Sequence, residues 1–280
     1  MTGPHYVPQG PMPGTVQGVP IQGASAFYGG NPATVLGLRA RQWMVVAIVL
    51  GCCYAMVCAV AGVAAWTTLT REPTTAELER AANAEVARRW QVWPAGRIFP
   101  ERLPYTVRRD KTEYASRLGI AAEGNCQNTV DPEIASVLSR HGCRAVLRAT
   151  YADQLQGIVV TVGVAAFPDA WKADRAYREL PKNPAADRSS GVRPALRAVS
   201  FPGTASARFL DAARQDRTSD RGGPYVMLTT AGHSDGRPAA AITKRLPGNP
   251  YAFAAQLADA VVRPLSARAV PDCSSREWRC

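Results

Sequence analysis

The chain has 280 residues, of which 46% are hydrophobic and 20% charged, and its net charge is +11 at pH 7. This composition excludes a collagen-like repeat and a wholly disordered chain, and the length is sufficient for a domain with its own core. The basic residues form no block of the kind that binds nucleic acid, so no nucleic-acid partner is expected.

Residues 1–43 are rich in Pro and Gly, and Arg39 and Arg41 are their only charged residues. Their apolar side chains are too scattered to build a core, so the segment is predicted to be a disordered cytoplasmic tail. Pro8 and Pro11 have the P-x-x-P spacing of segments that dock on aromatic grooves. The tail is therefore either a spacer or a binding site for a cytoplasmic protein partner.

Residues 44–66 contain no charged side chain. As a helix they would be roughly 34 Å long, enough for a hydrocarbon core of about 30 Å. Trp43 and Trp66 flank the segment, where aromatic rings prefer the headgroup level. We therefore expect an uncleaved transmembrane helix in the lipid bilayer. A lipobox-like site at Cys52 and a signal-peptidase-like site at 59–61 are the alternatives, and the length of the apolar run disfavours both.

Small residues recur on one face of this predicted helix at Gly51, Ala55, Ala59 and Gly62. Small side chains let two membrane helices approach closely, so the stripe is a candidate surface for helix packing in a homodimer. Ordinary small-residue content in an Ala-rich chain is the alternative explanation.

Arginines lie on both sides of the predicted helix, so the positive-inside rule does not decide its orientation. The soluble part holds an even number of cysteines: Cys126, Cys143, Cys273 and Cys280. An even count suits an oxidising compartment. We therefore expect a single-pass protein of the cell membrane, with its N-terminus in the cytoplasm and its C-terminal domain outside.

Local disulfide pairing, Cys126 with Cys143 and Cys273 with Cys280, is favoured among the pairings that these cysteines allow. The first bridge would close a loop across a predicted helix at 131–141, worth about 3 kcal/mol in the chain-entropy model. The alternative is that all of them are reduced, buried thiols. Neither pair has the C-x2-C spacing of a zinc site, so no metal is expected.

Residues 67–94 are predicted to form a juxtamembrane linker with a helix at about 75–92. Thr74 and Glu77 have the spacing of a capping box. One face of the helix is apolar, through Leu78, Ala82, Val86 and Trp90. The helix either stands as a stalk or packs on the domain, and its tryptophans favour packing.

Residues 95–280 are predicted to form the extracytoplasmic domain. Pro100 and Pro104 interrupt residues 97–107, which therefore form an edge strand or a loop. Strands are predicted at 143–151, 158–164, 195–201, 225–231 and 239–244, and helices at 131–141, from Asp169, at 205–214 and from Asn249. The expected fold class is α+β, with a mainly antiparallel sheet of about five strands and helices packed on it.

The sequence contains no motif that predicts catalysis, so neither an enzymatic activity nor a cofactor is expected. His233, Ser234 and Asp235 have the residue types of a catalytic triad, but they fall together in a predicted turn. The soluble part is basic, and Arg144 and Arg148 share one face of a predicted strand. They are the candidate contacts for an anionic cell-wall or lipid ligand.

The layout of a Pro/Gly-rich tail, one anchor and an Ala/Arg-rich outer domain resembles that of uncharacterised actinobacterial (Streptomyces-like) single-pass membrane proteins. The resemblance is architectural, covers the whole chain and implies an extracytoplasmic α+β domain. A similar layout is associated with the membrane protein linked to Streptomyces contractile injection systems, in which the tail side would face a cytoplasmic machine.

These observations leave three functions to be compared. The favoured one is a non-enzymatic, membrane-anchored envelope protein whose outer domain binds or senses a ligand or partner at the cell surface. The second is a membrane docking platform, in which the tail captures a cytoplasmic assembly such as a contractile injection system. The third is an envelope hydrolase, which would depend on a carboxylate or on His233.

Overall fold

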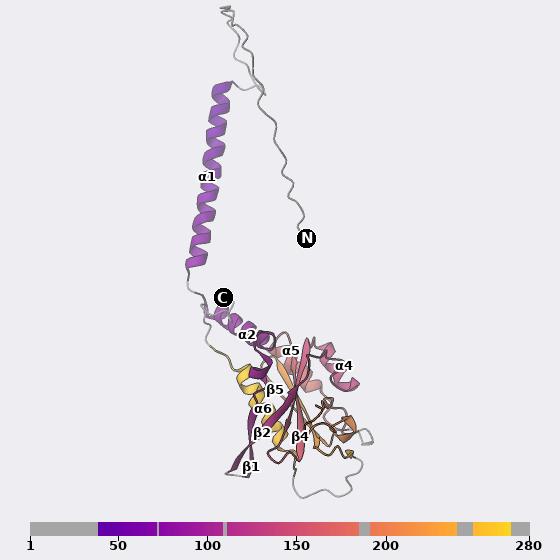
Figure 1. The fold of residues 1–280 in the computed structure, drawn as a ribbon. Helices are drawn as coiled ribbons and strands as arrows, with labels where there is room; N and C mark the ends of the chain where they lie inside the picture. The colour runs from indigo at the N-terminus through magenta and orange to yellow at the C-terminus, as the bar shows by residue number, and fades with distance from the viewer. Residues whose placement is uncertain (1–38, 72, 109–110, 185–190, 240–248, 270–280) are drawn as a thin grey trace, which may run out of the picture. The chain divides into compact units, whose positions relative to one another are not determined.

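The computed structural model describes residues 39–71, 73–108, 111–184, 191–239 and 249–269. The chain divides into two units, Met1–Glu72 and Pro73–Cys280. The first contains one long helix, and the second contains a sheet and the remaining helices (Figure 1).

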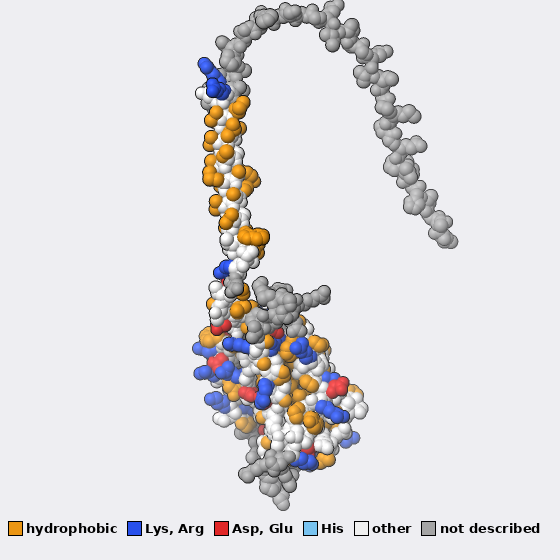
Figure 2. All heavy atoms as spheres, turned by 90° about the vertical axis from the view of Figure 1, so that its left-hand side faces the viewer, with side chains coloured by type: hydrophobic (Ala, Val, Ile, Leu, Met, Phe, Trp, Pro, Cys, Tyr) orange, Lys and Arg blue, Asp and Glu red, His pale blue; other side chains and the backbone are white. Residues whose placement is uncertain are grey.

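Helix α1 (Ala40–Thr70) contains the predicted span of residues 44–66. Its segment Arg41–Thr70 has a mean hydropathy of 2.6 and is long and apolar enough to cross a membrane. Figure 2 shows apolar side chains along its length, with basic side chains at both ends. In its last turns the hydroxyls of Thr67, Thr68 and Thr70 donate to backbone carbonyls of the helix, which satisfies these polar groups locally.

The second unit is built on one antiparallel sheet of six strands in the order β1-β2-β3-β4-β6-β5. The strands are β1 (Arg102–Arg108), β2 (Lys111–Ile120), β3 (Ala145–Ala152), β4 (Ile158–Ala166), β5 (Asp216–Gly222) and β6 (Tyr225–His233). The helices are α2 (Thr75–Val92), α3 (Ala95–Ile98), α4 (Pro132–Arg140), α5 (Ala170–Glu179) and α6 (Phe253–Ser266), with a 3-10 turn, η1, at Asp211–Ala213. The predicted α+β class is confirmed, and the expected number of strands was one too low.

The strands that sequence analysis missed, β2 and β5, both carry many polar residues. β5 reads DRTSDRG, has no aliphatic side chain and lies at the edge of the sheet beside β6. β2 pairs with β1 and β3 and leaves four of its ten residues exposed. Hydrophobic alternation is too weak in both to identify a strand, because pairing with a neighbour rather than burial forms them.

The predicted strand at 195–201 was wrong. This segment makes one isolated bridge, between Leu196 and Val130, and otherwise lies on the sheet rather than in it. Side chains accept hydrogen bonds from two of its backbone N–H groups: Thr161 Oγ1 accepts from Val199, and Asp211 accepts from Ala198. The predicted helix at 205–214 is reduced to η1. Most of the predicted strand at 239–244 lies outside the described residues.

Helices α2 and α6 cover one face of the sheet, and α4, α5 and the irregular residues 191–214, here called the crossover segment, cover the other (Figure 1). The first face holds the larger core, in which Tyr151, Val162, Met227 and Leu257 are fully buried. On the second face, Gly119, Gly163 and Gly232 leave room for the side chains of Phe201, Leu196 and Phe209. Both faces of β3 are covered, because Ala149 and Tyr151 are buried on the first face and Val146 and Thr150 on the second.

Helix α2 begins at the predicted capping box and packs on the domain. The buried Arg89 is paired with Glu85 at 2.7 Å and donates to the carbonyls of Pro264, Leu265 and Ala267. These are the carbonyls that the end of α6 leaves without helical partners. Since the hydroxyl of Tyr225 also donates to the carbonyl of Val86, α2 is fixed to the domain at several points.

Candidate functional site

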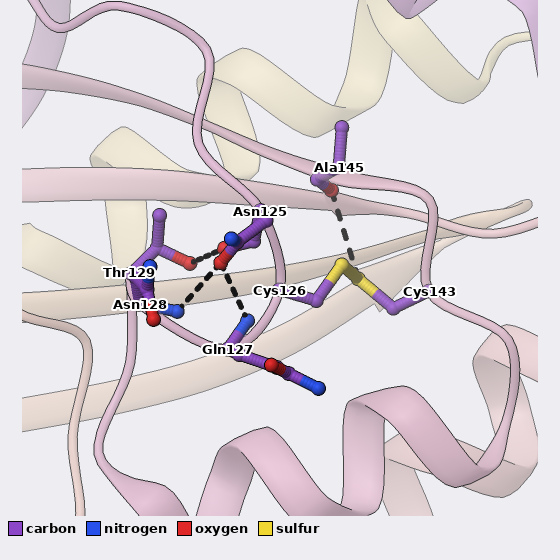
Figure 3. The surroundings of a disulfide bond; sticks show 7 residues. All are labelled: Asn125, Cys126, Gln127, Asn128, Thr129, Cys143 and Ala145. Atoms are coloured by element: carbon purple, nitrogen blue, oxygen red, sulfur yellow. Dashed lines mark hydrogen bonds between the residues drawn. A yellow bond between two sulfur atoms is a disulfide. The ribbon is translucent and has the colours of Figure 1, made fainter.

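The predicted Cys126–Cys143 pair is present, with the two sulfur atoms 1.98 Å apart (Figure 3). It joins the loop before α4 to the loop after it. In the first loop Asn125 accepts from the backbone N–H groups of Gln127 and Asn128 at 3.1 and 2.8 Å. Cys273 and Cys280 lie outside the described residues. The bridge therefore closes the chain around α4, close in sequence to the start of β3.

A buried ion pair holds the crossover segment to α4. Arg214 and Asp131 approach to 3.1 Å, with side chains 1% and 5% exposed. Asp131 occupies the N-cap position of α4, but its carboxylate accepts from the N–H of Ala195 instead of capping the helix. Arg214 also donates to the carbonyl of Leu196. The pair therefore places Ala195 and Leu196 against α4.

Ala195 and Leu196 line a pocket of about 360 Å³ between α4, the end of α5, the crossover segment and β5. We call it the α5–β5 pocket. Ile134, Leu196 and Leu228 form an apolar lining and are each at most 3% exposed. Ser219 lines the pocket from the exposed side of β5. The volume falls within the range of small-molecule sites.

The charged residues that line the pocket are Arg178, Lys182 and Arg217. Arg217 donates to the carbonyls of Pro194 and Pro181 at 2.5 and 2.8 Å, which fixes its guanidinium between the crossover segment and the end of α5. Burial lowers the pKa of Arg217, whereas Asp131 and Asp216 raise it, and the group stays a cation at neutral pH.

The three cations differ in how far they are already neutralised. Arg178 pairs with Asp174 at 2.8 Å. Lys182 is exposed and has no carboxylate partner among the described residues. Within its described lining, the pocket contains no Asp or Glu. The arrangement can therefore hold a molecule with an apolar body and a carboxylate or phosphate group.

Arg144 and Arg148, the predicted anion contacts, do not line this pocket. Arg144 is exposed just before β3, and its backbone N–H donates to the carbonyl of Ala166. Arg148 is half-buried, and burial lowers its pKa while Asp211 raises it. Its Nε atom is buried without a hydrogen-bond partner within the described parts of the chain. Their role in binding an anion remains a prediction.

The predicted stripe on α1 is fully exposed within the single chain: Gly51, Ala55, Ala59 and Gly62. A Cβ atom added at Gly51 or Gly62 would meet no atom within 4 Å. The surface is thus open to a second helix, and the homodimer stays a prediction.

His233 is the last residue of β6, and Ser234 and Asp235 form the turn that follows it, where Gly236 has a φ of +75°. Asp235 binds Arg237 at 2.5 Å, and this contact lowers the pKa of the carboxyl to about 2. The ring of His233 meets the ring of Tyr251 edge-on at 5.9 Å.

The described residues include no group of three or more His, Cys, Asp or Glu that could hold a metal ion.

Sequence reasoning missed the pocket because it missed the strand that forms one wall. Arg217 lies on β5, which was not predicted, and Leu196 lies in a segment that was assigned to the sheet. The predicted helix from Asp169 correctly placed Arg178 on α5, and Lys182 follows the end of that helix.

No protein-family model matches the chain, and no curated protein or solved structure shows significant similarity to it. The resemblance to actinobacterial membrane proteins therefore stays a prediction.

Proposed function

We propose that the chain is a single-pass membrane protein with a cytoplasmic N-terminus, whose domain outside the cytoplasm binds a small organic anion in the α5–β5 pocket. The observation that carries this proposal is the combination of an apolar lining with Arg178, Lys182 and Arg217. Binding rather than catalysis is proposed because the pocket offers cations, apolar side chains and the hydroxyls of Tyr177, Thr218, Ser219 and Thr229.

The outward orientation is supported by the Cys126–Cys143 bridge, since disulfides persist in oxidising compartments and are rare in the cytosol. The anchor is supported by the length and hydropathy of α1. With this orientation, the domain would meet solutes at the cell surface, and residues 1–38 would be on the cytoplasmic side.

The specificity follows from what each part of the pocket can contact. An alkyl or aryl group would be buried against Ile134, Leu196 and Leu228, and burial of each CH₂ is worth about 0.8 kcal/mol. A carboxylate would pair with Lys182, whose ammonium has no described acidic partner. An uncharged ligand of the same shape would lack the ion pair with Lys182. Inorganic phosphate would lack the apolar contacts with Ile134, Leu196 and Leu228.

The test uses hexanoate as the probe, with hexanol and inorganic phosphate as the two partial ligands. Methyl-labelled full-length chain in nanodiscs is titrated, and NMR shifts of the Ile134, Leu196 and Leu228 methyl groups are followed. Saturable shifts with hexanoate, and weaker binding of hexanol and phosphate, would support the proposal.

The matched variants are Lys182→Gln at the pocket and Lys111→Gln on the exposed β1–β2 hairpin. Loss of one charge-assisted contact should weaken hexanoate binding about tenfold in Lys182→Gln, with hexanol binding unchanged. Lys111→Gln should bind as the parent chain does. Equal affinity for hexanoate and hexanol, or no saturable shift with any probe, would contradict the proposal.

A further inference from the structure

A second hollow, of about 460 Å³, lies where α2, the start of α5, the β5–β6 turn and the end of α6 meet. We call it the α2–α5 hollow. Ala84 of α2, Trp171 of α5, Pro224 of the turn and Arg268 beyond α6 are among its lining residues. It shares no lining residue with the α5–β5 pocket.

Trp171 is the main apolar feature of this hollow. Its side chain is 65% exposed, although it stands on a helix whose Ala173 and Ala176 are fully buried. The guanidinium of Arg175 lies over its ring, 5.4 Å from the centroid. An exposed indole beside a cation suits the headgroup level of a membrane, where the ring and its N–H meet different surroundings.

The charges around Trp171 are mainly positive. Among the described residues, no carboxylate forms an ion pair with Lys172, Arg175 or Arg268. The acidic residue in the lining is Asp169, whose carboxylate accepts from the backbone N–H of Lys172. Asp174, one turn along α5, is already shared between Arg178 and Arg221. The surface therefore complements an anion.

We propose that Trp171, Lys172, Arg175 and Arg268 form a contact surface for the anionic phospholipid headgroups of the membrane in which α1 is anchored. The inference rests on the anchoring part of the proposed function. Residues 71–74 are the whole connection between α1 and α2, so the domain stays close to a bilayer that holds α1. Phosphate groups pair with the cations, and the indole enters the interface.

The experiment uses the full chain in nanodiscs that contain brominated phosphatidylcholine, either alone or mixed with phosphatidylglycerol. Bromine quenches tryptophan fluorescence at short range, and subtraction of the signal of Trp171→Phe isolates Trp171 from the other tryptophans. Quenching of this component in the phosphatidylglycerol nanodiscs, and its loss in phosphatidylcholine alone, is the expected result.

Charge variants sharpen the test. Each of Lys172→Gln and Arg175→Gln should weaken the association about fivefold, the effect of one cation near an anionic surface. Arg208→Gln is the control, because Arg208 is exposed beside Gly236, at the end of β6 away from the Gly223–Pro224 turn. Copurification of each variant with nanodiscs reports α1 anchoring separately, so failure of the anchor is distinguishable from failure of the surface.

Equal quenching in the two lipid compositions would overturn the role of anionic headgroups, and no quenching in either would overturn the contact itself. Quenching that appears only after deletion of residues 270–280 would show that the C-terminal segment of the chain occupies the hollow, which also contradicts the proposal.

Discussion

One face of the sheet packs against α2 and α6 through aliphatic and aromatic side chains, whereas the other is covered by α4, α5 and the irregular crossover segment. On the first face, periodic apolar residues pack on the sheet, and the buried Glu85–Arg89 pair joins α2 to α6 rather than to the sheet. On the second, a buried ion pair, threonine hydroxyls and glycines position a segment without regular structure. The α5–β5 pocket lies on the second face, where individual side-chain contacts rather than a periodic pattern position the covering segment.

The largest effect is expected from breaking the ion pair that holds the crossover segment. Arg214→Met should leave the carboxylate of Asp131 buried, with Arg193 as a weaker partner at 3.5 Å. We expect a loss of about 4 kcal/mol in the free energy of unfolding. Urea unfolding of the full chain in detergent micelles, followed by tryptophan fluorescence, measures it.

The control for this prediction is Arg221→Met, which removes an arginine that is 41% exposed and pairs with Asp174. It should cost less than about 1 kcal/mol, because water screens the pair. Similar losses in the two variants would mean that the crossover segment is not held by Arg214.

On the apolar face, Leu257→Ala tests packing alone. Leu257 is fully buried in α6, so its truncation should cost about 3 kcal/mol, from lost burial and the cavity left behind. The same unfolding measurement applies. Hexanoate binding should be unchanged in this variant, because the cavity lies on the face away from the pocket. A matching loss of binding would show that the two faces are not independent.

Gly163→Ala tests the close approach of the crossover segment to the sheet. A Cβ atom there would lie 2.8 Å from Leu196 Cδ1, so the leucine would have to move. We expect a cost of about 2 kcal/mol and weaker hexanoate binding, since Leu196 lines the pocket. Gly157→Ala is the control: it meets nothing within 4 Å and should leave stability and binding unchanged.

The smallest effect concerns the exposed turn beyond β6. The Arg237 contact lowers the pKa of Asp235 to about 2 from its ordinary value of 3.8. A depressed acidic pKa contributes stability above the unfolded value, and this contribution is lost as the pH falls from about 4 to about 2. In the Arg237→Gln variant, an NMR titration should show that the pKa of the Asp235 carboxyl rises toward 3.8. An unchanged pKa would assign the shift to another group.

The two faces also explain what the sequence could predict. The capping box of α2 and the existence of the last helix, expected from Asn249 and observed from Phe253, were read correctly, because both signals are local. The sequence could not predict that the Asp131 side chain binds Ala195 and Arg214 instead of capping α4, because these partners are 64 and 83 residues away. The pocket depends on these long-range contacts and on the polar strand β5, so no local pattern indicated it.

The central claim to test is that α1 crosses the membrane and delivers the disulfide-bearing domain to the outer side. Alkaline phosphatase fused after Cys280 reports this directly, because the enzyme is active only where its own disulfides can form. We predict high activity in intact cells. Low activity from a fusion shown to be expressed would place the domain in the cytoplasm and contradict the proposed orientation. The Cys126–Cys143 bridge would then not lie in an oxidising compartment.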